Sequence, residues 1–556
     1  MSTFNEQQTE EQLQALHIKE EEDLVQLLAK RQGIPYLDLS AIAIDVDALT
    51  LIPEQTAREA VLAVVQAVGR KLKVAVRNPD TDGVRAILDE LTRKRYAPQL
   101  FLASHHSLEK AWERYKEAAK TKPTLVGVVA IEAEAEERVA AEIKNTAQLA
   151  AALQPMLVSE DMEKISQSVD LILASALALA ASDIHIQPSE KNARLRLRLD
   201  GALQDVVFFN LKSYRLLLSR IKLLSGIKFN IQNRAQDGRF TIRLGKSDIE
   251  VRTSMLPEPY GESVVMRLLN PKTIAIELGE LGMQPPVFKK IEVELTKPNG
   301  MILTTGPTGS GKTTTLYTFL KKLITPDINI ITIEDPIEYH LAGVTQTQAD
   351  ASAGYDFGNG LRSILRQDPD VILVGEIRDF ETAEIAMHAA LTGHLVFSTL
   401  HTNNAAGIVP RLLDLGIKAN ILGPAINVAM AQRLVRRLCP ACATQAPLEG
   451  AEREAITAHL ASLPAPYQKP DLAQATVWHE KGCDKCNNSG FKGRIGIFEV
   501  FLVDDEAERL FLTNPAEADV RAFAARQGML TMQQDGILKV LAGITSWAEV
   551  GRVVGE

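Results

Sequence analysis

The alternation of hydrophobic and polar positions predicts a chain of mixed helices and strands. Residues 72–76 (LKVAV) and 193–199 (ARLRLRL) alternate with a period of two, which indicates strands with one buried face. Residues 84–91 carry apolar side chains at helical spacing. Residues 171–181 are apolar apart from Ser175, but these 11 residues fall well short of the roughly 18 that cross a bilayer. This stretch predicts a buried helix, and the whole pattern predicts an α/β fold.

Changes in the pattern divide the 556 residues into several predicted domains, as the length suggests. Between residues 119 and 155 the chain is rich in Ala, Glu and Lys and poor in bulky side chains, which is typical of a solvated linker. Pro271 marks the passage to the last unit. The predicted divisions are an N-terminal regulatory or docking domain (1–118), the linker (119–155), a second N-terminal domain (156–272) and a domain that carries the chemistry (273–556).

A phosphate-binding loop follows a predicted apolar strand at residues 301–303. The loop reads Gly306-x-x-x-x-Gly311-Lys312-Thr313, and a helical pattern continues to residue 323. In such loops, backbone N–H groups and the helix N-terminus bind phosphate, the lysine neutralises β/γ oxygens and the threonine holds Mg²⁺. The sequence therefore predicts ATP and Mg²⁺, a catalytic Lys312, and nucleotide contacts from Gly306, Pro307, Thr308, Gly309, Ser310, Gly311, Lys312, Thr313 and Thr314.

Acidic and histidine side chains follow the next apolar strands, as in parallel sheets that bind ligands beyond their carboxyl ends. The strand predicted at residues 328–333 precedes Glu334, Asp335 and Glu338, and the one at 371–374 precedes Glu376. A carboxylate there can orient the attacking water or hold the metal shell, and we predict Glu338 and Glu376 to be catalytic. His394 and His401 bracket a further strand. His401 is predicted to sense the γ-phosphate, whereas His394 is equally consistent with a structural role.

All four cysteines belong to one pattern, in which Cys439-x-x-Cys442 and Cys483-x-x-Cys486 are separated by 40 residues. Two such pairs make a tetrahedral zinc site. Closing a 40-residue loop costs about 3 kcal/mol, whereas structural zinc contributes about 10–16 kcal/mol. The spacing offers no additional ligand, so the zinc is predicted to be structural, in an element at about residues 435–495. The alternative is four free thiols.

The net charge of −9 argues against a general nucleic-acid binder, which needs a basic face. The first residues are acidic, and no apolar stretch follows that could be a signal peptide. We therefore expect a cytoplasmic protein.

Four segments together resemble the secretion ATPase superfamily, specifically its type IV pilus assembly and type II secretion motor ATPases. They are GPTGSGKTTT (306–315), TIEDPIEY (332–339), LRSILRQDPDVILVGEIRD (361–379) and AALTGHLVFSTLHTN (389–403). The segments at 181–188 and 236–244 resemble the second N-terminal domain of that family, and those at 34–40 and 51–58 resemble the first.

The resemblance implies a RecA-like P-loop ATPase core, preceding α/β N-terminal domains and a Cys₄ zinc element. It also implies a homo-hexamer, associated with the inner membrane, that acts on a polytopic platform protein. The family's Asp box maps to Glu334, Asp335 and Glu338, its Walker B acid to Glu376, and its His box to His394 and His401. Arginines that reach the nucleotide from the preceding domain map to Arg239 and Arg252, with Arg234 a weaker third, and Arg362 and Arg366 also match.

Two details of the resemblance remain open. Assembly and secretion members share the motor, and the cysteine spacing favours pilus assembly, with type II secretion as the alternative. Asn404 also stands where members commonly have Asp. The segment 10–33 lacks the pattern with which some assembly motors bind cyclic di-GMP, and its acids would repel that ligand. We therefore expect docking to a membrane-anchored partner through Leu24, Leu27 and Leu28 rather than cyclic di-GMP binding.

Two rival classes stay in view. A DNA-translocating ring would use the basic cluster Arg433, Arg436 and Arg437, and stimulation of hydrolysis by DNA would support it. A scaffold that binds nucleotide without turnover would show no steady-state hydrolysis, although Lys312, Glu338 and Glu376 argue against such degeneration.

Overall fold

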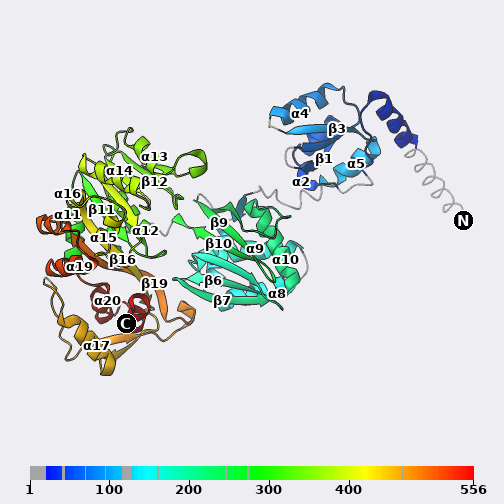
Figure 1. Cartoon of the computed structure of the whole chain (residues 1–556). Coiled ribbons are helices and arrows are strands. Elements are labelled where there is room, and N and C mark those ends of the chain that lie inside the picture. Colours follow the sequence, from blue (N-terminus) through cyan, green and yellow to red (C-terminus); the bar gives the residue numbers. More distant parts are fainter. Residues whose placement is uncertain are drawn as a thin grey trace. The chain divides into compact units, whose positions relative to one another are not determined.

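The computed structural model describes residues 20–39, 44–68, 71–93, 96–115, 127–131, 133–158, 162–244, 247–271, 276–465 and 467–555 (Figure 1). The chain forms two compact units, Met1–Leu125 and Val126–Glu556. Residues 1–19, which hold several of the N-terminal acids, lie outside the described ranges. Among the described helices, none combines the length and the apolar character that a membrane span requires.

The first unit is a small α/β domain built on a three-stranded sheet of order β1-β2-β3. Strand β2 carries the alternating residues 72–76, and Leu72, Val74 and Val76 are completely buried. A helix over residues 20–32 packs on this core through Val25 and Ala29. The remaining elements are α2 (Val46–Leu49), α3 (Glu54–Glu59), β1 (Leu62–Val68), β2 (Lys71–Val76), α4 (Asp82–Arg93), β3 (Ala97–Leu102) and α5 (His105–Glu113).

The second unit begins with a seven-stranded sheet of order β4-β8-β9-β10-β5-β6-β7. In β6 the leucines of the ARLRLRL pattern are buried and the arginines are half-exposed, as the period of two predicts. The strands are β4 (Val128–Ile131), β5 (Asp183–Pro188), β6 (Ala193–Leu199), β7 (Ala202–Phe209), β8 (Gln236–Leu244), β9 (Ser247–Glu258) and β10 (Gly261–Leu269). The helices are α7 (Ala133–Glu142), α8 (Thr146–Val158), α9 (Met162–Ala178) and α10 (Leu211–Ser225).

The segment predicted to be a linker is structured in its described part. Strand β4 pairs in parallel with β8, and Leu149, Leu153 and Leu157 of α8 are buried in the core of this sheet. These leucines are four residues apart and therefore lie on one helix face. The prediction of a linker at 119–155 is wrong for its described residues, 127–131 and 133–155, because an alanine-rich composition conceals a sparse but regular apolar stripe.

The third sheet has the order β13-β12-β14-β15-β11-β16-β19, with every neighbouring pair parallel except β16 and β19. Alternate residues of β11 enter two separate cores, Met301 and Leu303 on one face and Ile302 on the other. Burial of both faces is usual for parallel strands and explains their continuous apolar runs. The strands are β11 (Gly300–Thr305), β12 (Ile330–Glu334), β13 (Thr345–Gln348), β14 (Val371–Val374), β15 (Leu395–Leu400), β16 (Ile426–Leu438) and β19 (Phe491–Leu502).

Helices cover both faces of this sheet (Figure 1). They are η2 (Leu278–Leu281), α11 (Pro285–Glu294), α12 (Lys312–Leu323), η3 (Ala351–Ala353), α13 (Phe357–Ile364), α14 (Phe380–Leu391), α15 (Ile408–Asp414), α16 (Ala419–Ala425), α18 (Asp505–Phe511) and α19 (Glu517–Arg526). A smaller core joins the residues between β16 and β19 to the C-terminus. The elements of this part of the chain are β17 (Thr444–Pro447), α17 (Gly450–Ala461), β18 (Thr476–His479), η4 (Asp484–Cys486), α20 (Met532–Leu541) and α21 (Trp547–Val554).

Candidate functional site

A cavity of about 270 Å³ lies at the carboxyl ends of the parallel strands. It is lined by the phosphate-binding loop and by the acids and histidine that follow β12, β14 and β15, including Lys312, Thr313, Glu338, Glu376 and His401. These residues come from four separate segments, and the strand order brings them together. Hydroxyl and carboxylate oxygens are hard ligands of the kind that Mg²⁺ prefers, so the side chains present fit an ATP–Mg²⁺ site.

The phosphate-binding loop is packed tightly against β16. A Cβ atom at Gly306, whose φ is +149°, would lie 2.5 Å from the Gln432 carbonyl oxygen. At Gly311, the N-cap of α12 with φ +89°, it would lie 2.8 Å from Gln432 Nε2. Lys312 Nζ donates to the Gly306 carbonyl at 2.7 Å. Burial lowers the pKa of Lys312, while the Glu376 carboxylate opposes that shift. The ammonium group therefore lies where it can meet phosphate oxygens.

Glu376 and His401 contact each other directly. His401 Nε2 lies 3.0 Å from Glu376 Oε2, and Arg378 pairs with the other carboxylate oxygen. The Glu376 side chain is 13% exposed, so its carboxylate is oriented and partly shielded. The sequence predicts both residues for the site, but their contact follows only from the adjacency of β14 and β15.

The acids after β12 separate into two environments. Glu334 is buried and accepts hydrogen bonds from Tyr317, from Thr332 at 2.6 Å and from Gln346 at 3.1 Å. The Glu334 carboxylate therefore holds the side chains of Tyr317, Thr332 and Gln346 in place. Both acids line the cavity, and Glu338 pairs there with Arg252 Nη1 at 3.2 Å. Glu334 differs in that its oxygens already accept hydrogen bonds from three side chains of the chain.

Three arginines lie side by side on neighbouring strands of the preceding sheet. The register pairs Arg239 of β8 with Arg252 of β9, and Arg252 with Arg267 of β10. All three line an open cavity with Pro336 and Gln348. Asp183 accepts from Arg267 Nε at 3.0 Å. Arg267 is not predicted by the sequence motifs, although a lone charge in the apolar run 264–269 (VVMRLL) is a recognisable signal.

Other motif residues lie away from the cavity lining. His394 precedes β15, and its Nδ1 lies 3.0 Å from the Ala389 carbonyl oxygen, at the strand end opposite the site, which favours the structural alternative. Arg362 pairs with Glu381 at 2.5 Å, and Arg366 donates to Ser363 at 3.1 Å. Arg234 is exposed in the loop before β8.

Asn404 has a specific partner. Its Nδ2 donates to Glu517 Oε1 of α19 at 2.8 Å. An aspartate at this position would place two carboxylates in contact, which is unfavourable. The amide that distinguishes this chain from the common family pattern therefore matches its own Glu517.

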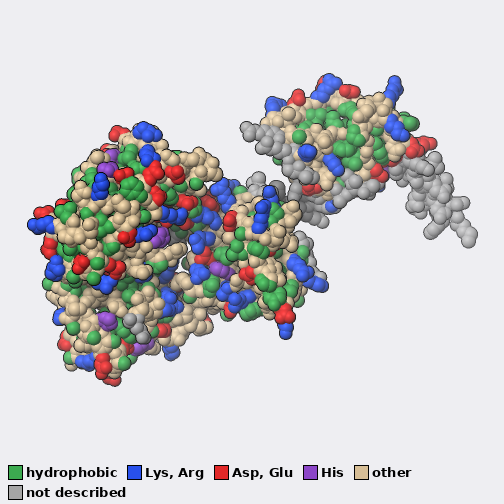
Figure 2. Space-filling view, in the orientation of Figure 1, with side chains coloured by type: hydrophobic (Ala, Val, Ile, Leu, Met, Phe, Trp, Pro, Cys, Tyr) green, Lys and Arg blue, Asp and Glu red, His purple; other side chains and the backbone are tan. Residues whose placement is uncertain are grey.

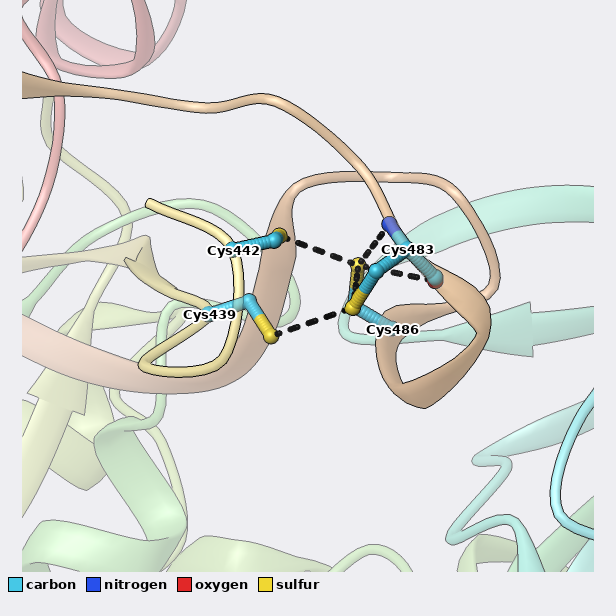
Figure 3. A group of neighbouring side chains, drawn as sticks. All are labelled: Cys439, Cys442, Cys483 and Cys486. Carbon is cyan, nitrogen blue, oxygen red and sulfur yellow. Dashed lines mark hydrogen bonds between the residues drawn. The ribbon is translucent and has the colours of Figure 1, made fainter. Parts of the chain in front are cut away.

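The four cysteines form one cluster, in which all ligand sulfur atoms lie within 4.8 Å of one another (Figure 3). The Sγ–Sγ distances are 4.0 Å for Cys439–Cys483, 3.8 Å for Cys442–Cys486 and 3.7 Å for Cys483–Cys486. A tetrahedron with Zn–S bonds of about 2.3 Å requires sulfur atoms about 3.8 Å apart. The cluster therefore fits Zn²⁺, as predicted.

The strand register explains the cluster. Cys439 follows β16, η4 ends at Cys486 shortly before β19, and these strands pair up to Leu438 and Phe491. Backbone N–H groups of Cys483 and Gly490 point at the Cys486 sulfur at 3.2 and 3.3 Å. Burial raises the pKa of Cys486, but these donors and the side chains of Cys483 and Cys442 together lower it to about 7. Such donors favour the thiolate that zinc requires.

In the basic cluster of the DNA-translocase rival, Arg433 and Arg436 are engaged within the chain, and Arg437 is exposed. Arg433 donates to the Asn403 carbonyl at 2.7 Å. Arg436 pairs with the buried Glu549 at 2.6 Å and stacks on Phe491. In the view of Figure 2, the described residues carry both basic and acidic side chains. This arrangement disfavours a phosphate-backbone track.

The fold and the cavity define a P-loop nucleotide-binding protein. The family described as Type II/IV secretion system protein matches residues 158–552, and an MshEN domain matches residues 32–122. The chain belongs to this Type II/IV secretion system protein family, which confirms the resemblance and the fold class predicted from the sequence.

Individual relatives agree. "Type IV pilus assembly ATPase PilB" of Myxococcus xanthus is 37% identical over 96% of this chain and 91% of its own length. "Type II secretion system protein E" of Klebsiella pneumoniae is 44% identical over 72% of this chain and 78% of its own. The solved ATPase DotB of Yersinia pseudotuberculosis shares the fold, with a TM-score of 0.50, 18% identity, and coverage of 72% of this chain and 94% of that one. Since relatives are named ATPases, the predicted ATP hydrolase class is confirmed for the family.

Proposed function

We propose that this chain is a motor ATPase that hydrolyses ATP to assemble a type IV pilus through an inner-membrane platform protein. The observation that carries the proposal is the cavity that unites Lys312, Thr313, Glu338, Glu376 and His401. Lys312 and the loop amides bind the phosphates, and Glu376, oriented by His401, accepts the proton of the attacking water. Thr313 and a neighbouring acid would hold Mg²⁺, which would neutralise charge on the phosphates.

Two variants test the division of labour between the acids. Glu376→Gln keeps the shape of the side chain and can still accept from His401, but it cannot accept a proton. We expect turnover to fall by about 10²–10⁴-fold while ATP binding persists. Glu338→Gln should have the smaller effect, because its partner in the chain is Arg252. Steady-state phosphate release and a fluorescent-nucleotide titration measure both, and a larger loss in Glu338→Gln would reverse the assignment.

The chain is proposed to act as a homo-hexamer in which Arg239 and Arg252 serve the nucleotide of a neighbouring copy. Their place on a separate sheet supports this, because they reach a nucleotide only where two domains meet. In the single chain Arg252 contacts Glu338 of the Asp box. Arginines supplied in trans contribute about 10³–10⁵ in turnover.

Mixing two inactive variants tests this role. Arg252→Ala and Lys312→Ala should each be nearly inactive alone, but a mixture should recover measurable turnover, because one copy supplies an intact loop and the other an intact arginine. A mixture of Arg239→Ala and Lys312→Ala should recover turnover in the same way. Arg243→Ala, which removes an exposed pair with Asp248, is the matched control and should stay active. A mixture that remains inactive would mean that Arg252 acts within its own chain.

Two observations support pilus assembly over type II secretion. The similarity to the Myxococcus xanthus and Thermus thermophilus pilus assembly ATPases extends over 96% and 95% of this chain, and so takes in the N-terminal unit, whereas that to the Klebsiella pneumoniae secretion protein covers 72%. The cysteine spacing points the same way. Deletion of the gene for this protein in its host should abolish surface pili and leave exoprotein secretion intact. Loss of secretion with intact pili would favour the secretion motor.

The N-terminal unit is proposed to dock this cytoplasmic protein to a membrane-anchored partner rather than to bind cyclic di-GMP. Leu24 and Leu27 are 52% and 65% exposed. Glu22, one of the acids invoked against an anionic ligand, instead bonds Ser104, Ser107 and Tyr36 within its own unit. The exposed leucines therefore carry the docking proposal, and saturable binding of cyclic di-GMP by the full chain would contradict it.

A further inference from the structure

The loop after β15, residues 401–405, is held by contacts from five separate segments. Each residue has its own partner: His401 with Glu376 at 3.0 Å, Thr402 N with Thr305 Oγ1 at 2.7 Å, Asn403 O with Arg433 at 2.7 Å, Asn404 with Glu517 at 2.8 Å, and Ala405 N with Glu499 at 3.2 Å. A loop so closely tied has one defined conformation, and that conformation carries His401 to Glu376.

Arg433 lies next to the phosphate-binding loop as well as next to the loop that carries His401. Its Nη2 donates to the Asn403 carbonyl at 2.7 Å and its Nη1 to the Gln432 carbonyl at 3.1 Å. A Cβ atom built on Gly306 would lie 3.1 Å from Nη1. The guanidinium group therefore lies between the first glycine of the phosphate-binding loop and the loop that carries His401.

The charge environment agrees with this placement. Arg433 is partly buried, which lowers its pKa, and the Glu499 carboxylate counters that effect. Glu499 in turn accepts from the amide of Ala405 in the same loop. The positive charge of Arg433 adds to the effect of burial in lowering the pKa of Lys312. The two cations therefore lie close enough to interact.

We propose that Arg433 is a positioning residue for ATP hydrolysis, which fixes the His401 loop against the phosphate-binding loop. The proposal rests on the proposed function. One terminal nitrogen donates to Asn403 of the loop and the other to Gln432, its own neighbour in β16. The side chain therefore ties the loop to the part of β16 on which the phosphate-binding loop packs, rather than acting on the phosphates. A planar guanidinium can donate in two directions at once, whereas a lysine ammonium on its flexible stem holds such a pair less well.

Three variants of the full chain test the proposal. Arg433→Met should lower kcat by about 10–100-fold, the loss that a displacement of about 1 Å can cause, and should change KM for ATP by less than about threefold. Arg433→Lys should recover part of kcat. Arg437→Met, which removes an exposed arginine of the same strand, is the matched control and should resemble the wild type. Wild-type kcat in Arg433→Met would overturn the proposal.

A double-mutant cycle with His401→Ala separates positioning from a direct role. If Arg433 acts through the loop, Arg433→Met should cost little more once His401 is absent, because coupled residues are not additive. Fully additive losses, or a loss of affinity for ATP but not for ADP, would instead place Arg433 on the phosphates and overturn the proposal.

Amide hydrogen exchange gives a readout that does not need turnover. The amides of Thr402, Ala405 and Gly407 are hydrogen-bonded in this loop. They should exchange faster in Arg433→Met than in the wild type or in Arg437→Met. Unchanged exchange would overturn the positioning role. An inactive wild-type protein would count against the proposed function alone, since the exchange result would still decide the role of Arg433.

Discussion

Lys312→Ala should abolish ATP hydrolysis, with turnover at least about 10³-fold below that of the wild type. The ammonium group lies at the cavity, 2.7 Å from the Gly306 carbonyl oxygen, where it can neutralise charge that develops on the β- and γ-phosphates. Removal of this point charge also weakens nucleotide binding. Steady-state phosphate release and a fluorescent-nucleotide titration measure the two losses separately.

A lysine on the same helix is the matched control for this variant. Lys322 is exposed in the last turn of α12, far along the helix from the loop, so Lys322→Ala should retain turnover and melting temperature. Lys312→Ala should keep a melting temperature close to that of the wild type, because its side chain contributes to the cavity rather than to a hydrophobic core. Undiminished hydrolysis in Lys312→Ala would refute an ATP-driven motor.

Removal of zinc should strongly destabilise the region around the cysteines. Elemental analysis should find one zinc per chain, and Cys439→Ser should lose it. Structural zinc contributes about 10–16 kcal/mol, against about 3 kcal/mol to close the intervening loop, so the cysteine segments should unfold without metal. The full element at 435–495 need not unfold, because Leu448, Ile456 and Val477 pack against α20 and α21 in a core of their own.

Hydrogen exchange and limited proteolysis locate this unfolding. Loss of protection should concentrate at residues 439–446 and 479–491, whereas the phosphate-binding loop, which contacts the middle of β16, should stay protected. Ala441→Ser lies between the first two cysteines without removing a thiol, and should bind zinc normally. A metal-free protein with unchanged protection would show that the four thiols need no ion.

The sequence predicts the ATPase sheet well because its chemistry is local. A buried parallel strand must be apolar on both faces, so β11, β12, β14 and β15 appear as short apolar runs, and the residues that follow each run carry the site. The zinc cluster was also predictable, since four cysteines in two pairs leave few alternatives.

The rest depends on register and packing. The pairing of Glu376 with His401 requires β14 and β15 to be neighbours, and the row from Arg239 to Arg267 requires three antiparallel strands in one register. Glu334 and Glu338 look alike in the sequence, and only the donors around Glu334 distinguish them. The stripe of Leu149, Leu153 and Leu157 is hard to predict because the overall composition of the segment around it resembles a linker.

The pairing of β16 with β19 has a consequence for how such chains diverge. The two strands fix the cysteine pairs at adjacent ends of one ribbon, so the polypeptide between Cys442 and Cys483 leaves and returns at almost the same point. Insertions and deletions there leave both the metal and the strand that packs on the phosphate-binding loop in place. A change in the length of this segment would therefore disturb neither the metal site nor the phosphate-binding loop, so of the two observations that support pilus assembly the similarity through the N-terminal unit is the stronger one.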